Sequence, residues 1–135
     1  MRRTASALMA ALLVPVAVFA ADLRITDSRG REVVVSNAVV NYGSLLTVDE
    51  DKDGIRVEQG DGVVRLKWAD VDTITVTKAD TATKPARVEL DIALRSGTHV
   101  AATLFRQGAM KLTGRSDLGE YTIDLDKIRR IAPMR

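Results

Sequence analysis

What the sequence lacks already narrows the fold and the chemistry. It contains no cysteine, so stability must come from packing and backbone hydrogen bonds rather than from disulfides. It contains a single histidine, His99, which leaves a transition-metal centre of the usual kind almost without ligands. No glycine-rich phosphate loop precedes a helix, and no segment has a sustained helical period. We therefore expect neither a nucleotide site nor a helical domain.

Aromatic residues are also scarce. After the apolar N-terminal stretch only Tyr42, Trp68, Phe105 and Tyr121 remain. Trp68 and Tyr121 fall on positions that the apolar pattern assigns to the core, so a platform of exposed rings for sugars or single strands is not expected. Tyr42 lies in a polar turn, and we predict that it is the aromatic residue most suited to contact a partner, with packing in the core or at a sheet edge as the alternative.

The N-terminal residues have the pattern of a secretory signal peptide. Arg2 and Arg3 precede the apolar run Ala5–Ala20, and Val18-Phe19-Ala20 offers a cleavage site. The run is short for a membrane anchor, which is the alternative, so we expect residues 1–20 to be cleaved and no membrane span to remain. The expected location is periplasmic or secreted.

Cleavage also changes the charge balance. The chain has 20 Lys and Arg against 18 Asp and Glu, and the two arginines near the start leave with the signal peptide. The mature chain is therefore balanced, and its net charge favours neither nucleic acid nor an anionic membrane as a partner.

One apolar pattern occurs twice. The stretch Gly119–Ile131 reads G-E-Y-T-I-D-L-D-K-I-R-R-I, and Gly62–Ile74 reads G-V-V-R-L-K-W-A-D-V-D-T-I. All apolar positions match at an offset of 57, with Trp68 opposite Leu125. The apolar residues step by two, then by three, which predicts a strand, a tight turn and a short closing strand.

The remaining segments are short β patterns separated by turns. We predict an all-β fold of mostly antiparallel strands in two related halves, residues 21–79 and 87–135, joined by a polar junction at 80–86. The halves form either one sandwich or barrel, or two small barrels packed together. Leu45–Val48 is predicted as a short strand and Gly114–Gly119 as a turn.

The first half carries an insertion of about ten residues around Leu45–Gly54. Its acidic part, Asp49–Gly54, has the D-x-D-x-D-G form of a calcium loop, with Asp49, Asp51 and Asp53 as ligands and Glu58 or Asp61 as a further one. Loop position twelve is Gly60, so the segment is not an EF-hand. A solvated acidic turn is the alternative.

Paired carboxylates give the only pattern that suggests a hydrolase. Asp124 and Asp126 are predicted on one face of a strand, and Asp70 and Asp72 hold a similar place in the first half. His99 sits after a hairpin turn with no nucleophile elbow in the chain, so we expect an exposed strand residue rather than a catalytic base. We expect no catalytic residues.

The second half resembles small β-barrels of the SH3-like or Sm-like kind. The resemblance rests on V-E-L-D-I-A-L-R-S-G-T-H-V at 88–100 and on I-D-L-D-K-I-R-R-I at 123–131, with a short hairpin between them. The first half follows the same order. Comparable tandem segments occur in uncharacterised secreted bacterial proteins, and the resemblance implies a fold but no ligand. The residues with which Sm proteins bind RNA are not identifiable here.

The sequence therefore predicts a non-enzymatic binding or scaffold module without a cofactor, or a calcium-stabilised domain as the alternative. We expect the partner to be another protein or a component of the cell envelope. The predicted contact residues are Tyr42 near the insertion and the basic side chains Lys127, Arg129 and Arg130 near the C-terminus.

Overall fold

The computed structural model describes residues 22–44, 46–80, 82, 87–104 and 110–134. The predicted signal peptide and most of the predicted junction lie outside these residues. Eleven strands and two 3-10 turns occur in the described part. In chain order they are β1 (Leu23–Asp27), β2 (Glu32–Asn41), β3 (Glu50–Asp51), β4 (Gly54–Gln59), β5 (Gly62–Lys67), η1 (Trp68–Asp70), β6 (Val71–Asp80), β7 (Arg87–Leu94), β8 (His99–Leu104), β9 (Lys111–Ser116), β10 (Gly119–Asp124), η2 (Leu125–Lys127) and β11 (Ile128–Pro133).

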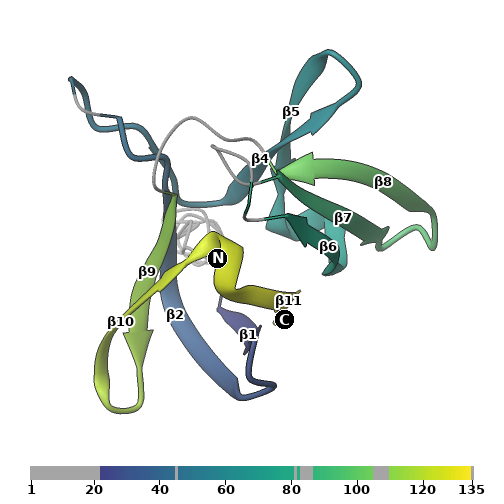
Figure 1. Cartoon of the computed structure of the whole chain (residues 1–135). Coiled ribbons are helices and arrows are strands. Elements are labelled where there is room, and N and C mark those ends of the chain that lie inside the picture. Colours follow the sequence, from purple (N-terminus) through teal and green to yellow (C-terminus); the bar gives the residue numbers. More distant parts are fainter. Residues whose placement is uncertain (1–21, 45, 81, 83–86, 105–109, 135) are drawn as a thin grey trace, which may run out of the picture.

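The strands form one curled antiparallel sheet, so the predicted all-β class is confirmed (Figure 1). Its order is β10-β9-β2-β1-β11-β6-β7-β8-β4-β5, with β3 paired to β2 beside this path. The sheet divides at its centre into two groups of five strands, which are joined by the pairing of β11 with β6. No helix among the described residues is long and apolar enough to cross a membrane.

The two groups do not follow the order of the sequence. β1 and β2 pair with β11 and β9, which are near the end of the chain. β4, in the first part of the chain, pairs with β8, and β6 pairs with β7. Each group therefore combines two consecutive strands from one part of the chain with the closing strands of the other part.

The repeated motif forms the strand, turn and strand that the sequence predicts. β5, η1 and β6 begin at Gly62, Trp68 and Val71, and β10, η2 and β11 begin 57 positions later. Trp68 and Leu125 each open a 3-10 turn, and both side chains are buried. The steps of three in the apolar pattern thus correspond to a 3-10 period.

The long strand β2 bends near Asn37. Asn37 has a φ of 54°, a conformation that asparagine tolerates better than most residues. The register with β9 shifts between Ser36 and Val39, which marks a bulge. The bend allows β2 to pair with β1 in its first part and with β9 in its second part.

Two local predictions are wrong. Residues 46–48 form no strand, because the chain there closes through the hydrogen bond from Tyr42 N–H to the Asp49 carbonyl, and β3 follows instead. Gly114 lies inside β9 rather than in a turn. A Cβ at Gly114 would overlap the Val35 side chain, so this glycine permits a close approach of β2.

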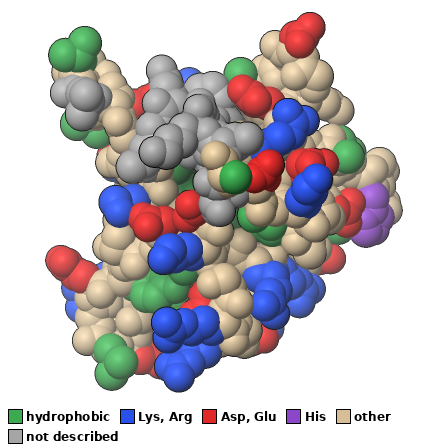
Figure 2. Space-filling view, viewed as in Figure 1, with side chains coloured by type: hydrophobic (Ala, Val, Ile, Leu, Met, Phe, Trp, Pro, Cys, Tyr) green, Lys and Arg blue, Asp and Glu red, His purple; other side chains and the backbone are tan. Residues whose placement is uncertain are grey.

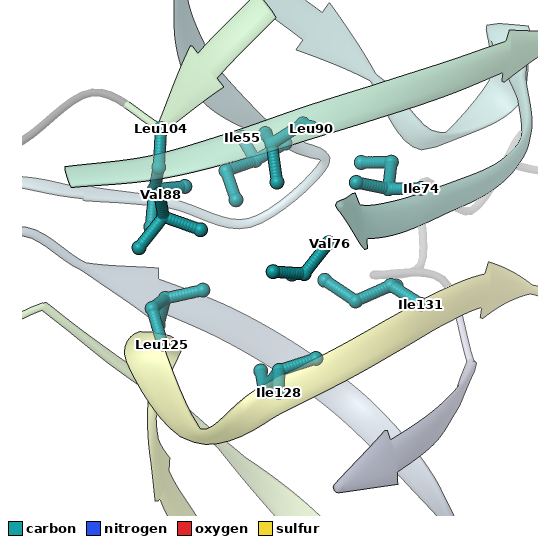
Figure 3. Close-up of a pocket in the computed structure, with 9 residues that line it drawn as sticks. All are labelled: Ile55, Ile74, Val76, Val88, Leu90, Leu104, Leu125, Ile128 and Ile131. Carbon is teal, nitrogen blue, oxygen red and sulfur yellow. The ribbon is translucent and has the colours of Figure 1, made fainter. Parts of the chain in front are cut away.

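The buried residues form one continuous core that crosses the join between β11 and β6. At this join nine apolar side chains from both groups surround a gap of about 10 Å³ (Figure 3). Leu125, Ile128 and Ile131 face Ile74 and Leu90 across it. The gap has no polar lining and is barely large enough for one water molecule, so it is a packing defect rather than a ligand site.

Candidate functional site

The insertion between β2 and β4 forms a hairpin whose base is closed by local hydrogen bonds. The Asn41 side-chain oxygen accepts a bond from the Gly43 N–H at 2.8 Å, and Gly43 has a φ of 73°. Such a turn fits an asparagine with a glycine two residues later. Val40 and Asn41 of β2 then pair with Asp51 and Glu50 of β3. We call residues 42–53 the inserted hairpin.

Tyr42 anchors this hairpin from inside the protein. Its side chain is buried, and its hydroxyl donates a hydrogen bond of 2.7 Å to Asp51 Oδ2. The same hydroxyl accepts a bond of 2.8 Å from the backbone N–H of Arg56 in β4. Burial and the bond to Asp51 raise the pKa of Tyr42, so the hydroxyl remains a donor at neutral pH. A direct contact of Tyr42 with a partner, as the sequence predicts, requires exposure that this ring does not have.

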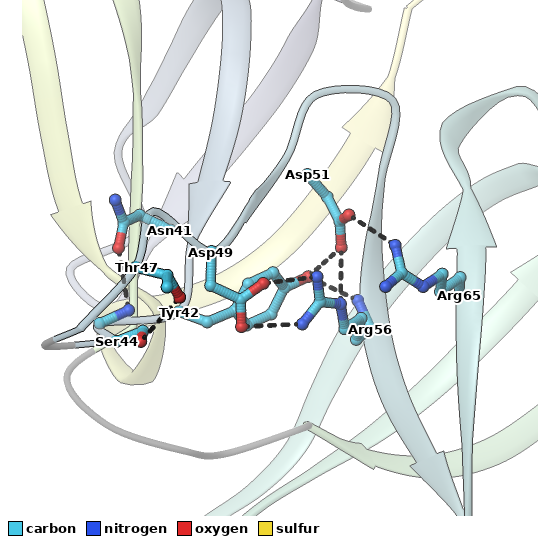
Figure 4. Close-up of polar contacts among 9 residues, drawn as sticks. Asn41, Tyr42, Ser44, Thr47, Asp49, Asp51, Arg56 and Arg65 are labelled. Carbon is cyan, nitrogen blue, oxygen red and sulfur yellow. Dashed lines mark hydrogen bonds and ion pairs between the residues drawn. The ribbon is translucent and has the colours of Figure 1, made fainter.

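Arg56 completes the anchor (Figure 4). Its two Nη atoms lie 3.0 and 2.7 Å from the two Oδ atoms of Asp49, and its Nε lies 3.2 Å from Asp51 Oδ2. Its guanidinium also lies 4.3 Å from the centre of the Tyr42 ring. Two-point pairing of this kind is stronger and more directional than a single ion pair. We call Tyr42, Asp49, Asp51 and Arg56 the anchor cluster.

The electrostatics of the anchor cluster follow from this pairing. The hydrogen bonds from Arg56 lower the pKa of the Asp49 carboxyl below its ordinary value. The same bonds raise the pKa of the Arg56 guanidinium. Both groups are therefore charged over a wide pH range, and they hold the base of the inserted hairpin against β4.

The predicted calcium ligands are occupied differently. Asp49 and Asp51 face the Arg56 guanidinium, and Asp51 also lies 3.4 Å from Arg65 Nη1. Asp53 is exposed, and the hydrogen bond that it accepts from the Trp68 N–H is made by its backbone carbonyl rather than by its carboxylate. Within the described ranges no group of three or more acidic or histidine side chains is placed to hold a metal ion. Of the further candidates, Glu58 accepts a bond of 3.5 Å from Thr103, and Asp61 lies in the β4–β5 turn.

A polar recess of about 160 Å³ lies beside the anchor cluster. Asp51 and Asp53 supply negative charge to it, and Arg65 and Lys67 supply positive charge. Gly54 forms part of its wall, where a Cβ would overlap the Leu66 carbonyl oxygen. Charges of both signs suit small zwitterionic groups, but Asp53, Arg65 and Lys67 are exposed, which also suits a solvated surface.

The tip of the inserted hairpin carries exposed apolar side chains. Leu46 and Val48 are 95% and 81% exposed. In Figure 1 this hairpin and the β4–β5 hairpin project toward the same side of the molecule, and Figure 2 shows hydrophobic side chains at the tip of the inserted hairpin. Val63 on β5, an outermost strand of the sheet, is also exposed. Sequence reasoning found the insertion but did not single out these side chains.

The paired aspartates do not share one strand face. Asp124 is the last residue of β10, whereas Asp126 lies in η2. Asp124 forms an ion pair of 2.7 Å with Lys111, whose hydrogen bond lowers the pKa of this carboxyl. Asp126 Oδ1 is buried without a hydrogen-bond partner among the described residues. His99 is an exposed residue of β8, as predicted, and its Nδ1 lies 3.0 Å from Asp91 Oδ2.

The predicted basic contact residues lie together on the surface. Lys127, Arg129 and Arg130 are exposed at the end of η2 and the start of β11. The β1–β2 turn adds Arg29 and Arg31, which are exposed beside them. The sequence could not indicate this addition, because the two segments are about a hundred residues apart and meet only through the β1–β11 pairing.

Comparison with protein-family models, with curated proteins and with solved structures found no match for this chain.

Proposed function

We propose that the protein is a non-enzymatic module of the cell envelope that binds another protein through the tip of the inserted hairpin. The observation that carries the proposal is the contrast between the base and the tip of this hairpin. The base is fixed by a buried tyrosine and a two-point ion pair, while Leu46 and Val48 at the tip are almost fully exposed.

This contrast is what a binding loop requires. Ordering a loop on binding costs conformational entropy, and a fixed base removes part of that cost in advance. Exposed leucine and valine side chains gain free energy when a partner covers them. Scattered exposed apolar residues are normal on protein surfaces, so the argument rests on their position at the tip of an anchored insertion.

The test is site-specific photo-crosslinking in the producing cell. A photo-reactive amino acid at position 46 is expected to give a discrete adduct with a partner protein, and Val48→Asp in the same chain is expected to abolish the adduct. Leu118, which is 101% exposed in the β9–β10 turn, provides the matched control position.

The same adducts from positions 46 and 118, or no adduct from position 46, would contradict the proposal. Loss of folding is checked separately by circular dichroism. Removing the tip between Gly43 and Asp49 is expected to preserve the fold, because the anchor cluster remains.

A further inference from the structure

Exposed lysine and arginine side chains of η2, β11 and the β1–β2 turn lie at one corner of the sheet. Hydrogen bonds between these segments hold the corner together. The Ser28 N–H donates a hydrogen bond of 2.9 Å to the Lys127 carbonyl, which joins the turn to η2. Arg129 Nη2 donates a bond of 2.9 Å to the Ser28 carbonyl. We call Arg29, Arg31, Lys127, Arg129 and Arg130 the basic corner. Figure 2 shows Lys and Arg side chains gathered on the lower part of this face, around β1 and β11.

The other group of strands contains the same corner with different charges. There the Arg95 N–H donates a bond of 3.0 Å to the Asp70 carbonyl, which joins the β7–β8 turn to η1. Asp70 and Asp72 occupy the places that Lys127 and Arg129 hold at the repeat offset of 57. The backbone arrangement therefore forms equally well with acidic residues, so the fold does not require the cations of the basic corner.

The positive charge of the basic corner is only partly compensated. None of its five side chains forms an ion pair with a described residue, whereas Arg24, Arg56 and Lys111 each do. The acidic groups that interact with the corner are Asp27, which attracts Arg29 and Arg31, and Asp124, which attracts Lys127 but is already paired with Lys111. The Asp27 carboxylate accepts bonds of 2.9 Å from the backbone N–H groups of Arg29 and Arg31. These bonds leave the guanidinium groups available to another anion.

We propose that the basic corner binds the phosphate headgroups of an anionic phospholipid membrane. The five side chains are exposed, and the two recesses described above are lined by other residues, so the corner suits an extended anionic surface. Protein interfaces usually have a core that is poor in charge and rich in aromatic side chains, and this corner has the opposite composition. Clustered lysine and arginine side chains are attracted to anionic lipid headgroups.

The net charge of the whole chain does not indicate this local cluster of positive charge. The mature chain is balanced because most of its acidic residues lie outside the corner, as in the inserted hairpin. Attraction to a surface depends on charge within about 10 Å at moderate salt, so local clustering outweighs the net balance. The corner is separate from Leu46 and Val48, and the proposal is therefore independent of the partner proposed for the inserted hairpin.

The experiment is flotation of the signal-free protein with phospholipid vesicles. We expect binding to vesicles that contain phosphatidylglycerol, no binding to pure phosphatidylcholine vesicles, and release at about 0.5 M NaCl, where charges are strongly screened. Absence of binding to the phosphatidylglycerol vesicles at low salt would overturn the proposal. Binding to soluble tripolyphosphate without binding to these vesicles would also overturn it.

Two double variants assign the binding to the corner. Arg29→Gln with Arg31→Gln, and Arg129→Gln with Arg130→Gln, are each expected to lower vesicle partitioning by about twenty-fivefold, or about fivefold per cation. The first pair leaves the hydrogen bond from Arg129 to Ser28 intact, so its effect on binding reports the loss of charge alone. Arg95→Gln at the equivalent corner and Arg115→Gln on β9 are controls that should bind like the wild type. Equal losses in the controls would contradict the assignment.

Discussion

The backbone N–H of Arg56 and the hydroxyl of Tyr42, fourteen positions apart, share a hydrogen bond of 2.8 Å, and the Arg56 guanidinium covers the tyrosine ring. This arrangement makes the insertion part of the fold at its base. The tip beyond it stays exposed. A change in the anchor cluster should therefore affect stability, and a change at the tip should affect binding.

Tyr42→Phe is expected to destabilise the protein by about 1–3 kcal/mol, because Asp51 Oδ2 and the Arg56 N–H both lose a buried partner. Urea denaturation followed by circular dichroism measures the free energy of unfolding. Tyr121→Phe is the matched control, since the Tyr121 hydroxyl has no hydrogen bond to a described residue, and it should change this free energy by less than about 0.5 kcal/mol. Equal effects of the two substitutions would show that Tyr42 contributes by packing alone.

Stability should fall at acid pH partly through Asp49. Its pKa in the folded protein lies below the ordinary value of 3.8, because Arg56 favours the carboxylate. The contribution is therefore complete above about pH 4 and is lost as the pH falls through the folded-state pKa. Melting curves of the wild type and Asp49→Asn should differ at pH 7 and converge in acid. Asp117→Asn, in the β9–β10 turn, should follow the wild type, and parallel curves for Asp49→Asn would contradict the prediction.

Calcium is expected to leave the melting temperature unchanged. The oxygens of Asp49 and Asp51 already face a guanidinium, whose charge repels a divalent cation. The measurement is a thermal melt with about 5 mM calcium against sodium chloride of the same ionic strength. A rise in melting temperature that Asp51→Ala abolishes would instead establish the calcium loop that the sequence pattern suggests.

Gly54→Ala should destabilise the protein strongly. The added methyl group would overlap the Leu66 carbonyl oxygen in the paired strand β5, so the two strands would have to separate. Overpacking of this kind typically costs about 1–3 kcal/mol. Gly62→Ala, at the other end of the same hairpin, meets no atom closer than 3.7 Å and should have little effect. Similar denaturation midpoints for the two variants would contradict this account.

The exchange of closing strands predicts that neither of two fragments of the chain folds without the other. Residues 21–80 contain β1 to β6, and residues 87–135 contain β7 to β11, yet β1, β2, β4 and β6 all pair with strands of the other fragment. Each fragment alone should lack cooperative unfolding, because isolated hairpins are marginal in water. Mixing them should give a 1:1 complex with a β spectrum. A cooperative melt of either fragment alone would argue against this dependence.

The sequence predicted local structure better than pairing. The steps of two in the repeated motif located β5 and β10, because such alternation depends only on neighbouring residues. The steps of three around Trp68 and Leu125 likewise located η1 and η2. Pairing of β2 with β9 is a relation between distant segments, and no local pattern determines it.

The sequence indicated where the candidate site lies but not which side chains bind one another there. The acidic spacing marked the inserted hairpin, but it could not show that Asp49 and Asp51 bind Arg56. The signal for this was available in part, since a lone arginine two residues after an acidic turn is a natural partner for it. Packing of Tyr42 in the core was one alternative for this residue, but its place in a polar turn could not show which groups its hydroxyl would bind.

The exchanged strands also determine the order in which the chain can fold. Leu23 pairs with Pro133, so the first strand has β2 beside it early but lacks its other neighbour, β11, until nearly the whole chain is available. At synthesis rates of roughly 5–20 residues per second this delay is on the order of ten seconds. Such a high contact order slows folding and keeps the emerging chain without a complete sheet. Because β11 is also the strand that joins the two groups, a chain with this connectivity cannot complete its sheet or its core until its last residues have been made.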